Sequence, residues 1–313
     1  MINKIKVVFL ATPDIAIESF DFFLKSNDYE LLALVSQPPK GLTRGKTKIH
    51  NIVKLAKENN IRVFEPEKIS KDENLIKELK SLKADFFVTF AFGQILSQEV
   101  IDIPKIATIN LHASLLPKYR GANPIAQSII DGCKFTGITT MKTVLELDAG
   151  DICLQEKIEI SDEMNVIELM EKISKISPNL LDETLKGLFN NTLQPVKQND
   201  KEATFTKKLK KEEKIIDWNM DYIFLHNKIR GMYQINTNHT TYNNKIIQIL
   251  KTKTKDCTTG TNGEIIDINK NGIVVKCSNG ALLIQTVKPE GKGKMEAASW
   301  ANGARIKKGD KFI

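Results

Sequence analysis

Short apolar runs that favour β-strands alternate with segments of helical spacing along the first half of the chain, and this alternation constrains the fold more than any other feature. The runs predicted to be strands are residues 4–11, 31–36, 62–64, 85–92, 106–111 and 138–144, and helical spacing occurs over residues 15–24 and 49–56. Strands that alternate with helices predict a mainly parallel α/β sheet covered on both faces. Because ligands collect beyond the carboxyl ends of such strands, we expect chemistry just after residues 11, 36, 92 and 110.

A long helical segment precedes a C-terminal part of a different kind. Apolar residues recur at helical spacing over residues 166–188, where Pro178 is expected to break or bend the helix. The polar residues 191–206 are predicted to be a linker. A helix is then expected over residues 221–230, followed by strands at residues 246–250, 263–268, 273–276 and 281–287. Asn-Gly pairs at residues 271–272 and 279–280 are typical of hairpin turns, so this part is predicted to be a small β-barrel.

Positive charge is concentrated in the C-terminal part. Residues 201–313 carry 21 Lys and Arg against 11 Asp and Glu, a net charge of +10, whereas residues 1–200 carry 25 against 27, a net charge of −2. Lysine-rich surfaces are common, but an excess confined to one domain suggests a partner with many phosphates.

A basic loop follows the second predicted strand, on the ligand side of the sheet. Residues 37–48 contain no Asp or Glu, and their basic residues are Lys40, Arg44, Lys46 and Lys48. Such a loop is either an exposed lysine loop or a contact for the phosphates of a nucleic acid.

The remaining composition excludes several classes of protein. No apolar run approaches the roughly 18 residues that a membrane span needs, and the first strand has no small-residue cleavage site after it, so we expect a cytoplasmic protein. The cysteines form no Cys-x-x-Cys pair and the four histidines show no ligand spacing, so neither disulfides nor a metal is expected. No Gly-x-Gly-x-x-Gly follows the first strand, which argues against a nucleotide-binding oxidoreductase.

The most specific motif begins where the strand at residues 106–111 ends. Asn110 and His112 are two residues apart, so in an extended chain their side chains point to the same face. Alone, such a pair is more often a satisfied polar turn. The segment continues as Ser-Leu-Leu-Pro at residues 114–117, and Asp148, 38 residues after Asn110, lies in the sequence Leu-Asp-Ala-Gly.

Together, the Asn-x-His, Ser-Leu-Leu-Pro and Leu-Asp-x-Gly motifs resemble those of the folate-dependent formyltransferase family. The resemblance implies a Rossmann-like catalytic domain in which Asn110, His112 and Asp148 are catalytic. It implies 10-formyltetrahydrofolate as the formyl donor and no metal. It also implies that two stretches enclose the folate, with contacts from Phe92, Gly93, Ile95, Leu96, Ser114, Leu115, Leu116 and Pro117.

The resemblance extends over nearly the whole chain to members of this family that formylate methionine on a tRNA. It covers residues 11–14, 37–38, 44–46, 214–218 and 289–295. It implies formyl transfer to the α-amino group of methionine on initiator methionyl-tRNA, giving formylmethionyl-tRNA for translation initiation. The expected tRNA contacts are Lys40, Arg44, Lys46 and Lys48.

The resemblance also gives an expected organisation. Residues 1–190 form the catalytic domain, residues 191–206 the linker, and residues 207–313 a basic, OB-like β-barrel that binds tRNA. We expect a monomer. Formylation of an amino-sugar nucleotide, by a catalytic domain with a similar small barrel, stays open as the alternative. A non-catalytic tRNA-binding protein of this fold is disfavoured, because the three catalytic residues are intact.

The chain departs from the family pattern at three places. The family commonly has glycine at Ala11, and it has Asp and Gly where this chain has Val144 and Glu146. It also has a Pro-Trp-Pro-like turn at residues 233–236. None of these departures removes a catalytic residue.

Overall fold

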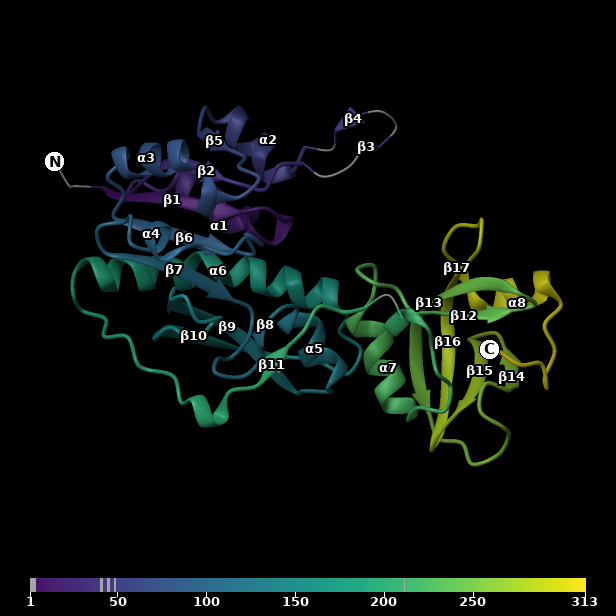
Figure 1. The fold of residues 1–313 in the computed structure, drawn as a ribbon. Coiled ribbons are helices and arrows are strands. Elements are labelled where there is room, and N and C mark those ends of the chain that lie inside the picture. Colours follow the sequence, from purple (N-terminus) through teal and green to yellow (C-terminus); the bar gives the residue numbers. More distant parts are fainter. Residues whose placement is uncertain (1–3, 40–41, 44–45, 48, 211) are drawn as a thin grey trace. The chain divides into compact units, whose positions relative to one another are not determined.

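The computed structural model describes residues 4–39, 42–43, 46–47, 49–210 and 212–313, which group into two compact units (Figure 1). The first unit comprises residues 1–121, 137–158 and 170–205. The second comprises residues 122–136, 159–169 and 206–313. Within the described residues, no helix combines the length and apolar character that a membrane crossing requires.

A seven-stranded sheet forms the centre of the first unit, in the order β10-β9-β7-β6-β1-β2-β5. Its strands are β1 (Ile5–Ala11), β2 (Tyr29–Val35), β5 (Arg62–Phe64), β6 (Phe86–Phe90), β7 (Ala107–His112), β9 (Phe135–Lys142) and β10 (Ile152–Glu159). The strands from β7 to β5 are parallel to their neighbours, and β9 runs antiparallel to β7. The mainly parallel sheet predicted from the sequence is therefore confirmed.

Alternating side chains of β1 enter two different cores. Val8 and Leu10 pack with buried residues of α3 (Glu73–Ser81) and α4 (Gln98–Ile101). Between them, Phe9 contacts Phe20 and Phe23 of α1 (Ile17–Lys25). Since successive side chains of a strand point to opposite faces, the sheet is buried on both sides. The other short elements are η1 (Asp14–Ala16), β3 (Leu42–Thr43), β4 (Lys46–Thr47), α2 (Asn51–Glu58), η2 (Ile69–Lys71), β8 (Arg120–Gly121), η3 (Asp200–Glu202) and β11 (Phe205–Thr206).

Helix α6 (Val166–Phe189) continues through Pro178, so the break suggested by the sequence does not occur. Proline has no N–H, and the carbonyl of Ser174, four residues earlier, therefore loses its usual helical donor. The hydroxyl of Ser177 donates to that carbonyl at 2.8 Å and takes the place of the missing bond. It also lies 2.7 Å from the hydroxyl of Ser19 in α1, so the same residue joins two helices.

The second unit is built on an antiparallel sheet in the order β12-β13-β16-β15-β14, with β17 paired to β16. Its elements are α5 (Pro124–Ile130), η4 (Glu212–Lys214), α7 (Tyr222–Gly231), β12 (His239–Tyr242), β13 (Lys245–Lys255), β14 (Ile265–Asn269), β15 (Gly272–Cys277), β16 (Gly280–Pro289), β17 (Met295–Glu296) and α8 (Ala297–Ala304). Its core includes Trp218 and Trp300, whose rings stack on Phe312. Both predicted hairpin turns are present, and Asn279 adopts the left-handed conformation (φ 60°) in the second.

Two segments that the sequence analysis assigns to the catalytic domain, residues 122–136 and 159–169, cluster with this second unit. The reason lies on α7. A Cβ on Gly231 would come within 2.8 Å of Ile130, so the absence of a side chain lets α5 pack closely against α7. The guanidinium of Arg230 donates to the carbonyls of Ser161 and Met164 at 3.1 and 2.7 Å. A cut at residue 206 would remove both contacts from α7.

Replacement of Ser177 by alanine tests whether its hydroxyl compensates for the hydrogen bond that Pro178 cannot make in α6. We expect Ser177→Ala to reduce the free energy of unfolding by about 1–3 kcal/mol, because the buried Ser174 carbonyl loses its donor. Urea unfolding followed by circular dichroism measures the effect. Ser81→Ala is the control, since the Ser81 hydroxyl also donates to a carbonyl but at an exposed site, and its effect should stay within about 0.5 kcal/mol. Equal effects of the two changes would contradict this role of Ser177.

Candidate active site

Asn110 lies at the carboxyl end of β7, beside Thr89 of the neighbouring parallel strand β6. The hydroxyl of Thr89 donates to Oδ1 of Asn110 at 2.7 Å. This bond fixes which end of the amide is held by the protein. The Nδ2 group has no partner among the described residues, and it remains as an open hydrogen-bond donor at the end of the sheet.

His112 is the last residue of β7 and is only 6% exposed. Its Nε2 lies 2.8 Å from the carbonyl oxygen of Tyr119, and because a carbonyl can only accept, Nε2 carries the hydrogen. Its Nδ1 lies 3.5 Å from Oδ2 of Asp148, which is longer than an ordinary hydrogen bond. The ring is therefore held at one nitrogen and faces a carboxylate at the other.

Asp148 lies in the turn between β9 and β10 and adopts the left-handed conformation, with φ 50°. Its Oδ2 accepts a hydrogen bond from the backbone N–H of Gly121 at 2.7 Å. Oδ1 has no protein partner in the part of the chain that the structure describes. The family that the sequence resembles has glycine at the position of Glu146. The backbone of Glu146 is not in the left-handed conformation, so this position of the turn does not need glycine. The carboxylate thus presents a free oxygen beside His112.

The loop after β6 contributes mainly backbone to this edge of the sheet. Phe92 and Leu96 are 4% and 8% exposed and belong to the core cluster shared with α3 and α4, whereas Ile95 is 89% exposed. Gly93 is left-handed (φ 77°), and a Cβ there would meet the Gln37 amide at 2.3 Å. Gln37 in turn donates to the Phe92 carbonyl at 2.7 Å. Of the four predicted folate contacts in this loop, only Ile95 has an exposed side chain.

The loop after β7 is held by hydrogen bonds of its own. Ser114 is fully buried, and its hydroxyl donates to the carbonyl of Lys118 at 2.6 Å. The hydroxyl of Thr139 in β9 donates to the Ser114 carbonyl at 2.6 Å. Leu116 is 3% exposed, while Leu115 and Pro117 are half-buried. The predicted folate contacts in both loops are therefore placed at the carboxyl ends of adjacent strands, but their role stays a prediction.

Several residues that hold the site in place could not be identified from the sequence. Thr89 holds Asn110, and the carbonyl of Tyr119, a left-handed residue (φ 63°), holds His112. Gln198, in the segment predicted to be a linker, donates to the backbone of the Asp148 turn. A single Thr at a strand end or Gln in a polar stretch matches no motif, and only the three-dimensional register brings these groups together.

The basic loop cannot be compared with the structure at the level of side chains. Lys40, Arg44 and Lys48 lie outside the described residues. Lys46 belongs to β4, of which the backbone alone is described. The assignment of these four residues to tRNA therefore stays a prediction.

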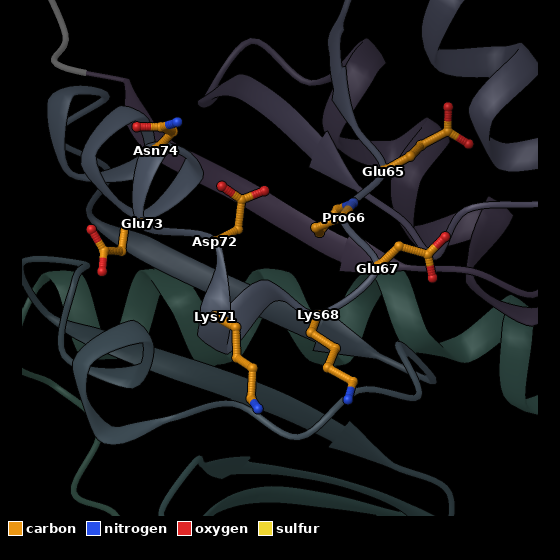
Figure 2. A pocket seen from close by; sticks show the side chains of 8 residues that line it. All are labelled: Glu65, Pro66, Glu67, Lys68, Lys71, Asp72, Glu73 and Asn74. Carbon is orange, nitrogen blue, oxygen red and sulfur yellow. The ribbon is translucent and has the colours of Figure 1, made fainter.

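A separate hollow lies beyond the carboxyl end of β5 (Figure 2). Its lining residues are Glu65, Pro66, Glu67, Lys68, Lys71, Asp72, Glu73 and Asn74. Gln94 joins this segment to the loop after β6, because its side chain accepts from the Ile69 amide and donates to the Pro66 carbonyl, each at 2.8 Å. The hollow contains none of the predicted site residues. Among the described residues no group of three or more His, Cys, Asp or Glu is placed to hold a metal ion.

Comparisons with known proteins show the family to which the chain belongs. Residues 5–185 match the model of the family described as "Formyl transferase", and residues 208–305 match "Formyl transferase, C-terminal domain". Methionyl-tRNA formyltransferase of Fusobacterium nucleatum is 39% identical over 98% of this chain and 99% of its own length. That of Mycoplasma mycoides is 38% identical over 96% of this chain and 95% of its own length.

A solved structure shares the fold. The sugar 3N-formyl transferase WlaRD superposes with a TM-score of 0.68 and 21% identity, covering 93% of this chain and all of its own. The two family matches together span most of the sequence and include Asn110, His112 and Asp148. This chain therefore belongs to the formyl transferase family.

Proposed function

We propose that the chain transfers the formyl group of 10-formyltetrahydrofolate to the α-amino group of methionine on initiator methionyl-tRNA. The observation that carries this proposal is similarity over the full length to proteins named methionyl-tRNA formyltransferase, which covers both units. The net charge of +10 on residues 201–313 supports a substrate rich in phosphates.

Asn110 is suited to stabilise the charge that develops during transfer. When the amine nitrogen bonds to the formyl carbon, the formyl oxygen becomes negatively charged, and a donor directed at it lowers the barrier. Thr89 holds Oδ1 of Asn110, which leaves Nδ2 as the open donor. Nε2 of His112 donates to Tyr119 in this structure, so donation from His112 to the formyl oxygen requires exchange of that bond.

His112 and Asp148 are suited to proton transfer. The attacking amine must lose a proton, and the folate nitrogen whose bond to the formyl carbon breaks must gain one, so the protons balance over the reaction. The free Oδ1 of Asp148 can accept the proton that the amine loses, directly or through water. The imidazole lies beside this carboxylate, with Nδ1 3.5 Å from Oδ2, so the two groups together can accept a proton and pass it on.

The two loops at the ends of β6 and β7 suit a flat heterocycle. Such a ligand needs apolar surface together with a few polar groups that fix its orientation. We assign the apolar surface to Ile95, Leu115 and Pro117, and backbone contacts to Phe92, Gly93, Leu96, Ser114 and Leu116. The second unit and Lys40, Arg44, Lys46 and Lys48 are assigned to tRNA.

An assay of formyl transfer tests the substrate. The purified chain is given 10-formyltetrahydrofolate with charged initiator tRNA, with charged elongator methionine tRNA, or with a nucleotide-linked amino sugar. We expect formylation of the initiator tRNA and not of the other two. Formylation of the sugar alone would replace this proposal by the alternative reaction, and formylation of neither tRNA would refute the tRNA assignment.

Removal of the proposed catalytic groups should lower the rate of formyl transfer more than it lowers the affinity for folate. We expect His112→Ala and Asp148→Asn each to lower turnover by roughly two or more orders of magnitude, the usual scale for a group that stabilises charge or transfers protons. Single-turnover formylation gives the rate, and fluorescence titration gives folate affinity, which should change much less. Near-normal turnover in either variant would show that its assigned role is wrong.

Removal of positive charges from the basic loop should weaken the use of tRNA and leave folate binding unchanged. We expect the double change Arg44→Ala and Lys46→Ala to raise the KM for tRNA while folate binding is retained, because phosphate contacts position the nucleic acid. The matched control is Lys25→Ala with Lys80→Ala, two exposed lysines that pair with Asp21 and Glu99. If folate binding falls as much as tRNA use, the loop acts on the folate side instead.

Affinity for tRNA should depend steeply on salt, and part of this dependence should come from the second unit. Lys251 and Lys253 are exposed on β13. We expect their joint replacement by glutamine to lower the slope of log affinity against log salt by about 0.7–0.9 for each phosphate that the variant no longer binds. Binding of tRNA to the full chain is measured across a salt series, with the Lys25 and Lys80 pair changed to glutamine as control. An unchanged slope would show that this face of β13 does not contact the tRNA phosphates.

A further inference from the structure

A buried glutamine from the supposed linker binds the turn that carries Asp148. Gln198 is 5% exposed. Its Nε2 donates to the carbonyl of Asp148 at 2.8 Å and to the carbonyl of Gly150 at 2.7 Å. Both hydrogens of the amide are therefore used to hold the backbone of one short turn.

Arg120 fixes the glutamine in this position. It is 1% exposed, and its Nε and Nη2 donate to Oε1 of Gln198 at 3.0 and 2.9 Å. Nη2 also donates to Asp200 at 2.8 Å. A guanidinium can only donate and a carbonyl can only accept, so the orientation of the amide follows from its partners. Every hydrogen-bonding position of Gln198 is occupied.

The turn held in this way needs support. Asp148 has a φ of 50°, a conformation that residues other than glycine seldom adopt and that persists only where the surroundings enforce it. The next residue after Arg120, Gly121, donates its N–H to Oδ2 of Asp148. Two consecutive residues of β8 therefore hold Asp148, Gly121 through the carboxylate and Arg120 through Gln198 and the backbone.

We propose that Arg120 and Gln198 are positioning residues that set the direction of the Asp148 carboxylate toward His112. Neither is assigned a contact with the reacting groups. The pair acts by keeping the turn at residues 148–150 in one conformation, so that Oδ2 stays beside Nδ1 of His112 and Oδ1 stays free. For its kinetic test this inference rests on the proposed function.

The test uses Gln198→Glu in the full chain. Glutamate has the same length and keeps an oxygen for Arg120, but it puts a second oxygen against the carbonyls of Asp148 and Gly150. We expect kcat to fall about 10- to 100-fold, the scale for a catalytic group displaced by about an ångström, with the KM for folate and tRNA within about twofold. Asn199→Asp, the same chemical change at the exposed neighbouring residue, should leave kcat unchanged.

A double-mutant cycle separates positioning from a general structural role. If Gln198 acts through Asp148, Gln198→Glu should cause no further loss of kcat in a chain that already carries Asp148→Asn. An equal loss in both backgrounds, or a normal kcat in the single variant, would overturn the proposal. If the glutamate variant does not fold, Gln198→Met is used in the same cycle, since it removes the donors without adding charge.

A readout that does not use formylation keeps the two proposals apart. The amide proton of Gly121 donates to the Asp148 carboxylate, so its NMR shift and its exchange rate report the position of that carboxylate. We expect Gln198→Glu to move this signal and speed its exchange, and Asn199→Asp to do neither. An unmoved signal would overturn the positioning role. Failure of the wild-type chain to formylate tRNA would refute the proposed function only.

Discussion

Burial of the seven-stranded sheet on both faces is the constraint on which the rest of the first unit depends. Val8 and Leu10 point to one core and Phe9 to the other, so the middle of β1 has no face left for polar side chains. Polar groups are excluded from the middle of such strands and are accommodated where the strands end. Asn110 and Thr89 are register partners at that edge, and the parallel pairing of β6 and β7 alone brings them together.

At three places where the chain departs from regular structure, side chains donate hydrogen bonds to backbone carbonyls. Ser177 supplies the hydrogen bond that Pro178 cannot give, Arg230 binds the carbonyls of an irregular segment, and Gln198 binds those of a left-handed turn. A buried carbonyl without a donor is costly, so each irregular segment requires a polar side chain of matching reach. The turn that carries Asp148 is stabilised by the same means as the helix interior.

The sheet could be predicted from the sequence, and so could the positions of the residues proposed as catalytic, whereas the residues that hold them in place could not. Asn110, His112 and Asp148 lie in motifs of fixed spacing, and the strands are marked by apolar runs that the sheet buries. Gln198 lies in a polar stretch without periodicity, where composition favours a linker. Its partner Arg120 is 78 residues away in the sequence, and that pairing follows from tertiary packing alone. The continuation of α6 through Pro178 could not be predicted for the same reason, because local propensity contains no information about a compensating hydroxyl.

The discontinuity of the second unit has a consequence for the order in which the chain can fold during synthesis. The segments at residues 122–136 and 159–169 leave the ribosome before the last segment of the first unit, residues 170–205. They also leave it long before residues 206–313, which they must contact. Until α7 is made, α5 has no partner for the surface that faces Gly231. Contacts between segments this far apart in sequence form late and slow the folding of a domain. The first unit can complete its sheet beforehand, so it is expected to fold first and the second unit to fold only after residues 206–313 have been made.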